Sequence, residues 1–235
     1  DVVAVLSENE QCYVPAYADD ILATFTCYGT REKLPFIPTP RAVRVNLLAI
    51  GSYLYNAVRR APAIMRRKLQ RLVHGKHVLR PIYTIPLGYA NQVDLPITPM
   101  RERTTDVFFA GSVAHCADDA ALIRRLAASP KDFSRRELAR TLQTLAVNEP
   151  AIRVGLNIKT DFRKSILSSA KAYSRRMMDA KICPIPRGQS LESFRFFEAL
   201  RYGCIPIVET LPSRRFYDGS PAIEITTWSE LHTLI

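Results

Sequence analysis

The sequence predicts an α/β protein with mainly parallel sheets, and three observations lead to this class. Strand-like and helix-like apolar patterns alternate from residue 105 onward, as they do in doubly wound sheets. Residues 181–209 read as a strand, a polar loop, a helix and a second strand, and a crossover helix of this length joins parallel strands. The chain has 235 residues and 47% hydrophobic content, which is enough for two modest lobes of this class.

Three strands are predicted in the first hundred residues. Residues 1–6 form an apolar, β-branched run that we expect to be buried, and residues 21–28 form a second β-rich run. Residues 78–89 read as a strand that prolines interrupt. The following segment, 91–105, has the proline-rich and charged composition of a linker. We therefore place a boundary near residue 100, with a first lobe at 1–100 and a second at 101–235.

The stretch between the second and third strands is basic. Residues 44–72 predict one or two helices broken near Gly51 and Pro62. Much of the net charge of +11 falls nearby, in the basic segment 59–80, which contains no acid. Its cations are Arg59, Arg60, Arg66, Arg67, Lys68, Arg71, Lys76 and Arg80. Apolar residues between 64 and 73 can form one side of the same helix, which is typical of a basic amphipathic helix on anionic lipid or an anionic polymer; the alternative is an ordinary solvated helix face.

The second lobe is predicted to alternate strands and helices. The predicted strands are 105–112, 152–158, 181–185, 204–208 and 222–225, and the predicted helices are 118–128, 135–147, 164–178, one that ends at Gly203, and 228–235. The first of these strands ends in Gly111 and Ser112, small residues that let the backbone approach a ligand closely. We treat both as candidate binding residues.

The loop and helix after residue 185 carry the main candidate site. Parallel strands place this loop at their carboxyl edge, where open α/β sheets bind ligands. Ser190 or Ser193 can serve as N-cap, and the free N–H groups of the helix would join Arg187 and Arg195 in holding an anion. Glu198, three residues beyond Arg195, supplies a carboxylate that can accept hydrogen bonds from ribose hydroxyls. The residues thus favour a nucleoside diphosphate, and the alternative is a surface ion pair between Arg195 and Glu198 with Arg187 solvated.

The same segment, PRGQSLESFRFFEALRYGCIPIV, resembles the signature of the exostosin family of glycosyltransferases. The resemblance implies a GT-B architecture of two Rossmann-like lobes, with the first, acceptor-side lobe partial here and the second lobe holding the donor. It implies transfer of a sugar from a nucleotide-sugar donor, with a UDP-sugar favoured, to a hydroxyl of a glycan or glycoconjugate. The donor-binding roles that it implies fall on Arg187, Gly188, Ser193, Arg195 and Glu198, with Gly111 and Ser112 facing the donor across the cleft.

Glycosyl transfer requires a stabilised leaving diphosphate and a deprotonated acceptor hydroxyl. Arg187, Arg195 and the helix end meet the first requirement, so Arg195 is also a candidate catalytic residue. We expect no metal and no other cofactor, and the chain has no Asp-x-Asp motif. A general base should come from the first lobe, where we favour Glu8. The other acids near strand ends there are Glu10, Asp19 and Asp20.

A rival function is a noncatalytic module that binds anionic polysaccharide, nucleic acid or a membrane surface through the basic segment. The glycosyltransferase hypothesis predicts no nucleic-acid partner. The sequence also lacks the phosphate loop and the dinucleotide-binding glycine motif of other nucleotide-binding folds. No apolar run approaches the roughly 20 residues of a membrane span. We expect a cytoplasmic protein, peripheral at a membrane through the basic segment, or a lumenal Golgi domain whose anchor was removed. The five cysteines are odd in number and widely spaced, which favours core thiols.

Overall fold

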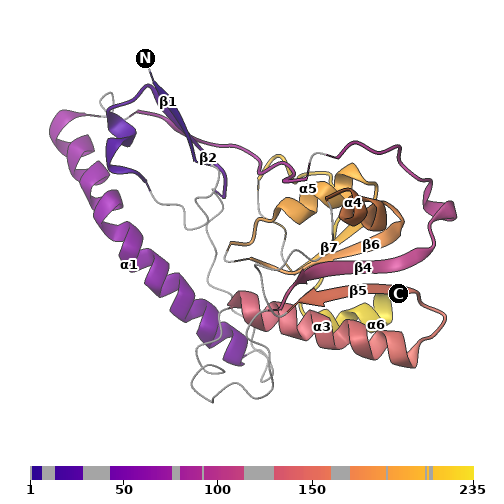
Figure 1. The fold of residues 1–235 in the computed structure, drawn as a ribbon. Coiled ribbons are helices and arrows are strands. Elements are labelled where there is room, and N and C mark those ends of the chain that lie inside the picture. Colours follow the sequence, from indigo (N-terminus) through magenta and orange to yellow (C-terminus); the bar gives the residue numbers. More distant parts are fainter. Residues whose placement is uncertain are drawn as a thin grey trace. The chain divides into compact units, whose positions relative to one another are not determined.

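The computed structural model describes residues 2–6, 14–28, 43–75, 80–91, 93–113, 130–159, 170–188, 190–209, 211 and 214–235. It divides into two compact units: unit 1 comprises Asp1–Leu87 with Gln189–Glu192, and unit 2 comprises Gly88–Gly188 with Ser193–Ile235. Each unit has a parallel sheet with helices (Figure 1), which confirms the predicted α/β class. The units divide after Leu87, and the domain boundary near residue 100 stays a prediction.

Unit 1 contains a small parallel sheet in the order β1-β2-β3. Its elements are β1 (Val3–Leu6), η1 (Ala16–Asp19), β2 (Ala23–Thr26), α1 (Val43–His74) and β3 (Ile82–Thr84). Phe25 of the central strand stacks on Tyr83 of β3, with ring centroids 5.3 Å apart. The prediction that the first strand is buried was wrong, because β1 lies at the sheet edge and exposes Val3 and Val5.

Helix α1 is one continuous helix of 32 residues, so the predicted breaks at Gly51 and Pro62 do not occur. A proline removes one helical hydrogen bond, and the carbonyl that loses its partner is that of Val58. Val58 and Pro62 are both exposed, so water can satisfy this carbonyl. The guanidinium of Arg67 forms an ion pair with Asp19 at 2.9 Å and donates to the Arg80 carbonyl at 3.0 Å, which fixes one side of α1 to unit 1.

Unit 2 is built on five parallel strands in the order β5-β4-β6-β7-β8. The strands are β4 (Thr105–Ser112), β5 (Val154–Lys159), β6 (Ala180–Ile185), β7 (Ile205–Val208) and β8 (Ile223–Glu224), close to the predicted ranges. The chain adds β5 on one side of β4 and all later strands on the other. The order therefore reverses between β4 and β6, and such a reversal is where open α/β sheets bind ligands.

Helices cover both faces of this sheet (Figure 1). Helices α4 (Ala170–Met178) and α5 (Phe194–Arg201) lie on one face, and α3 (Pro130–Asn148), η4 (Trp228–Glu230) and α6 (Leu231–Leu234) lie on the other. Side chains of β4 alternate between the two cores: Phe108 and Ala110 join the α4/α5 core, while Val107 and Phe109 join the α3/α6 core. Burial of this strand on both faces explains its continuous apolar sequence. The predicted helix 118–128 lies outside the described residues.

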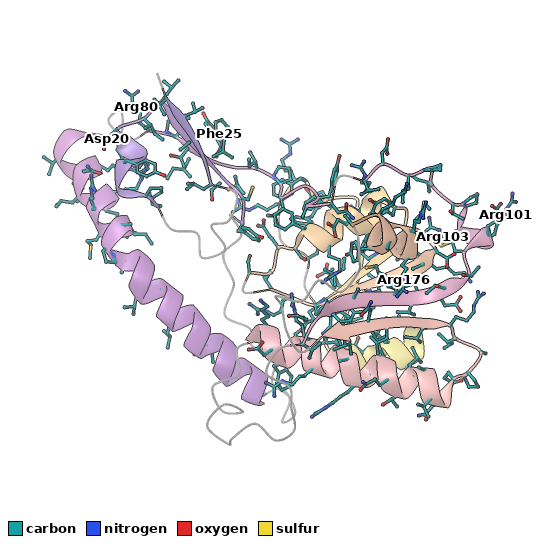
Figure 2. All side chains as sticks on the ribbon, viewed as in Figure 1. Asp20, Phe25, Arg80, Arg101, Arg103 and Arg176 are labelled. Atoms are coloured by element: carbon teal, nitrogen blue, oxygen red, sulfur yellow. The ribbon has the colours of Figure 1, made fainter. Side chains whose placement is uncertain are left out.

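A buried arginine holds together the edge of the sheet at which the strands begin. Arg103 precedes β4, is 3% exposed, and is labelled in Figure 2 near the start of that strand. Its guanidinium donates to the carbonyls of Thr98 at 3.0 Å, Ala180 at 2.6 Å and Tyr202 at 2.8 Å. Ala180 begins β6, and Tyr202 precedes β7. One side chain thus links the starts of three neighbouring strands.

Three cysteines fall within the described residues, and all are free and buried: Cys27, Cys183 and Cys204. This confirms the prediction of core thiols for these three, and Cys12 and Cys116 lie outside the described residues. Burial raises the pKa of Cys204 to about 11, although Arg103 opposes the shift. Within the described parts of the chain, no helix is both long and apolar enough to span a membrane.

Candidate functional site

The candidate site lies at the carboxyl edge of the unit 2 sheet, where the strand order reverses. Strand β4 ends there in Gly111 and Ser112, and β6 continues there into Pro186, Arg187 and Gly188. Helix α5 follows the β6 loop, with Ser193 as N-cap and Arg195 in its first turn. The fold therefore brings two predicted groups of site residues, far apart in sequence, to one edge of the sheet.

Arg195 bridges α5 and the end of β4. Its Nη2 donates to the carbonyl of Ala110 at 2.6 Å, and its guanidinium carbon lies 5.3 Å from the ring centroid of Phe109. The Nε atom is buried and has no hydrogen-bond partner among the described residues. Burial alone would lower the pKa of Arg195, but the charges of Tyr173 and other nearby groups outweigh burial and raise it. The side chain is therefore a permanent, well-positioned cation with an unused N–H.

Gly111 is the position at which this cation approaches the backbone of β4. A Cβ atom at Gly111 would lie 2.8 Å from Cζ of Phe109 and 3.5 Å from Nη2 of Arg195. The first distance is too short for a real contact, so any larger residue would displace Phe109. Sequence reasoning took this glycine as a place for close approach, and in the structure the groups that approach it are Phe109 and Arg195.

Glu198 is buried on the same helix, one turn beyond Arg195. Its side chain is 6% exposed, its Oε1 accepts from the backbone N–H of Asn91 at 3.0 Å, and its Oε2 accepts from the hydroxyl of Tyr173 at 3.1 Å. No ion pair joins Arg195 and Glu198 in the described structure, so the alternative of a surface ion pair is wrong. Because each carboxylate oxygen has two lone pairs, Glu198 keeps capacity for further hydrogen bonds.

Sequence reasoning missed the two partners of Glu198. Asn91 precedes β4 in the segment taken as a linker, and its side chain also donates to the Ala170 carbonyl at 3.0 Å and to Ser174. Tyr173 lies on α4, and burial raises its pKa well above the ordinary range. Tyr173 lies among apolar positions that face inward, and a buried tyrosine hydroxyl usually has a hydrogen-bond partner. Its position in the sequence could therefore have predicted a buried acceptor nearby. The linker position of Asn91 offered no such signal.

Ser193 and Arg187 occupy the positions expected from the loop and helix pattern. The hydroxyl oxygen of Ser193 accepts from the backbone N–H of Arg195 at 3.3 Å, as an N-cap does. The backbone N–H of Arg187 donates to Oε2 of Glu209 at 3.3 Å, and its Nε donates to the Gly188 carbonyl at 3.5 Å. Burial lowers the pKa of Arg187, although Glu209 opposes the shift. Arg187 is therefore a partly buried residue of the site edge, and the alternative of a fully solvated loop arginine is wrong.

Glu209, immediately after β7, is a further polar residue at this edge. Its carboxylate accepts from the Ser134 hydroxyl, and the Ser134 oxygen accepts from Nε1 of Trp228 at 3.0 Å. Burial raises the pKa of Glu209 against the opposing effects of Ser134 and Arg187. The signal that could have found it was its place at the carboxyl end of a strand that neighbours the strand before Arg187.

The structure gives fewer contacts for the remaining predicted site residues. The carbonyl of Ser112 accepts from Nη1 of Arg135 at 3.1 Å, and its half-buried side chain lies at the end of β4. Glu8, the predicted base, lies outside the described residues, as does Glu10. Asp19 pairs with Arg67, and Asp20 is exposed. Among the described residues, no group of three or more His, Cys, Asp or Glu side chains could hold a metal ion.

Comparison with known proteins agrees with the predicted family. The model of the exostosin GT47 domain family matches residues 65–215, which cover the end of α1 and most of unit 2. An Exostosin-1 homolog from Caenorhabditis elegans is 47% identical over 36 residues, a segment that covers 15% of this chain and 9% of that relative. The chain thus matches a small part of the relative's length. Because the family model spans more than half of the chain, the protein belongs to the exostosin GT47 family of glycosyltransferases.

Proposed function

We propose that this protein transfers a sugar from a nucleotide-sugar donor, with a UDP-sugar favoured, to a hydroxyl of a glycan or glycoconjugate acceptor. Membership of a glycosyltransferase family supports the reaction class. The observation that carries the donor site is Arg195, whose buried guanidinium reaches the end of β4 at the strand-order reversal and keeps an unpartnered Nε.

The donor diphosphate would lie between α5 and the ends of β4 and β6. Arg195 supplies a permanent cation there, and Arg187 supplies a second from the β6 loop. Each charge-assisted hydrogen bond to a phosphate contributes about 1.5 to 3 kcal/mol. Ser193 caps α5 with its oxygen acceptor, so in this proposal its contribution is to hold the first turn, and therefore Arg195, in place. Gly188 keeps the backbone of the β6 loop open to the donor, Gly111 leaves room for Phe109 and Arg195, and Ser112 lines the β4 end.

The donor ribose would bind to Glu198. The hydrogen bonds from Tyr173 and Asn91 fix the orientation of its carboxylate and leave a lone pair on each oxygen. Two neighbouring ribose hydroxyls can donate to these lone pairs. In this arrangement Tyr173 and Asn91 are positioning residues, because they act on the donor through Glu198.

The transfer itself forms one bond and breaks one bond. The acceptor oxygen attacks the anomeric carbon of the sugar while the bond from that carbon to the diphosphate oxygen breaks, and its electron pair leaves with the diphosphate. Arg195 and Arg187 stabilise the negative charge that develops there, so we propose that the reaction needs no metal or other cofactor. The acceptor proton passes to a general base, for which we propose Glu8.

The donor site is tested by thermal melting of the protein with UDP, GDP and CMP and their common sugar conjugates. A ligand at one hundred times its dissociation constant adds about 2.7 kcal/mol of stability. We expect a shift with the uridine compounds that is lost in Arg195→Gln and in Glu198→Gln. The matched control is Arg201→Gln, which should keep the shift. Arg201 lies on the same helix as Arg195, and its Nη2 is 3.4 Å from Oδ1 of Asp94.

Circular dichroism of each variant separates loss of binding from loss of fold. Glu198→Gln keeps a carbonyl oxygen that can accept from Asn91, so we expect this variant to stay folded. Retention of the uridine shift in folded Arg195→Gln and Glu198→Gln would refute the proposed site. If no nucleotide shifts the melting of the cooperatively folded wild-type protein, the noncatalytic binding module gains support instead.

A further inference from the structure

Helix α1 carries a row of exposed apolar side chains along one side. Its members are Leu54, Val58, Met65, Leu69 and Leu72, each more than half exposed, with Leu72 reaching 83%. Their spacings of three, four and seven residues return to the same side of a helix with 3.6 residues per turn. We call this row the apolar stripe. It is the reverse of the usual arrangement, in which the apolar side of an amphipathic helix faces the core.

The side of α1 that contacts the rest of unit 1 lies opposite the apolar stripe. Arg67, which pairs with Asp19 and donates to the Arg80 carbonyl, lies about 200° around the helix from Met65 at about 100° per residue. Ala63, about 160° from Met65 in the same rotational sense, lines a cavity of ≈ 250 Å³ with Val14 and Pro15, and Arg66 lies at the same cavity. Among the described residues, the contacts of α1 with the rest of unit 1 therefore leave the apolar stripe exposed.

Cations flank the apolar stripe on both sides. The 32 residues of α1 contain seven Lys and Arg and no Asp or Glu. Arg66 lies about 100° to one side of Met65, and Lys68 lies about 60° to the other, with Arg71 beyond it. All three are exposed. An apolar row bordered by cations on a helix without acids matches a surface that is anionic at its face and apolar just beneath it.

We propose that α1 lies in the plane of an anionic lipid surface, with the apolar stripe at the boundary between headgroups and acyl chains. Arg66, Lys68 and Arg71 then contact the anionic headgroups. A second copy of this chain fits less well, because two acid-free basic helices would repel each other. A dissolved polyanion would neutralise the cations but leave the stripe in water. This surface is on unit 1 and does not depend on the proposed donor site on unit 2.

Vesicle sedimentation tests this surface. We expect the protein to bind phosphatidylcholine vesicles that contain phosphatidylserine and not those that lack it, with binding weakened by salt. Replacing Met65 and Leu69 by Gln, or Arg66 and Lys68 by Gln, should each weaken binding about tenfold, since every basic or large apolar contact contributes severalfold. All four side chains are exposed, so the fold should persist.

Matched controls come from unit 2. Val147→Gln removes an exposed apolar side chain from α3, and the pair Arg175→Gln with Arg176→Gln removes two exposed cations from α4; Arg176 is labelled in Figure 2. We expect both controls to bind vesicles as the wild-type protein does. If the controls weaken binding as much as the α1 variants, attraction is nonspecific and the proposal fails.

Insertion of the stripe is tested separately by fluorescence. The sequence has one tryptophan, Trp228, which is fully buried in unit 2 and serves as an internal reference. In Leu69→Trp, we expect brominated acyl chains to quench the added emission and to leave that of Trp228 unchanged. Vesicle binding without quenching would overturn insertion and indicate purely ionic binding to headgroups. Concentration-dependent dimerisation that Leu69→Gln abolishes, with no vesicle binding, would assign the stripe to a second copy of the chain.

Discussion

Replacement of Gly203 by Ala should destabilise unit 2 through the buried guanidinium of Arg103. Gly203 has φ +70°, and a Cβ there would lie 2.8 Å from Nη2 of Arg103. The left-handed backbone alone costs an alanine about 1 kcal/mol. The guanidinium cannot move aside without giving up a hydrogen bond to a carbonyl such as that of Tyr202, a loss of about 1.5 to 3 kcal/mol. The expected total is about 3 kcal/mol.

Gly219 provides a control with the same backbone and no clash. It also has φ +70°, and a Cβ there would meet nothing within 4 Å, so Gly219→Ala should cost only about 1 kcal/mol. Urea unfolding followed by the fluorescence of Trp228, which lies in unit 2, measures both variants. Equal losses in the two alanine variants would refute the reasoning. In an Arg103→Met background the extra cost of Gly203→Ala should disappear, since the shorter apolar side chain leaves room.

Three further predictions concern unit 2. Ser193→Ala removes the N-cap of α5 and should lower the free energy of unfolding by about 1 kcal/mol in urea titration, with Ser229→Ala as an exposed control; no change would mean that the cap is dispensable. Gly111→Ala should cost about 1 to 3 kcal/mol through overpacking against Phe109 and should also weaken nucleotide-induced melting shifts; unchanged melting would show that Phe109 moves freely. Burial would raise the pKa of Asp106, but bonds from Lys181 and Arg153 outweigh it and lower the pKa, so its stabilisation is present above the ordinary value of 3.8 and lost as pH falls below it. The stability difference between wild type and Asp106→Asn should therefore shrink in acid melts, and a constant difference down to low pH would contradict this.

The fold of unit 2 could be predicted from the sequence because its parallel strands are buried on both faces. Such strands appear as continuous apolar runs, and β4, with Phe108 and Phe109 turned to opposite cores, is the clearest example. Local turn and cap signals predicted where helices begin and end. In α5, Ser193 is the N-cap and Gly203 follows the end of the helix.

The features that could not be predicted depend on exposure and on distant contacts. Continuity of α1 through Pro62 depends on the exposure of this turn to water, which a local pattern does not reveal. The charge and position of Glu198 were visible in the sequence, but its burial and its bonds to Tyr173 and Asn91 arise only when α4 and the segment before β4 meet α5. Sequence spacing therefore predicted the residues of the candidate site but not the groups that hydrogen-bond to them.

In unit 2, Arg103 lies at the edge of the sheet opposite the one that carries the candidate site. It binds carbonyls where β4, β6 and β7 begin, whereas Arg195 and Glu209 lie at or beyond the opposite, carboxyl edge. The carbonyls that Arg103 binds, those of Thr98, Ala180 and Tyr202, lie away from the carboxyl edge. We therefore expect that edge to tolerate changes of shape and charge while the strand order is kept. If the proposed donor site is correct, redesign of its preference is best confined to the loops that follow β4, β6 and β7, with Arg103 and Gly203 kept unchanged.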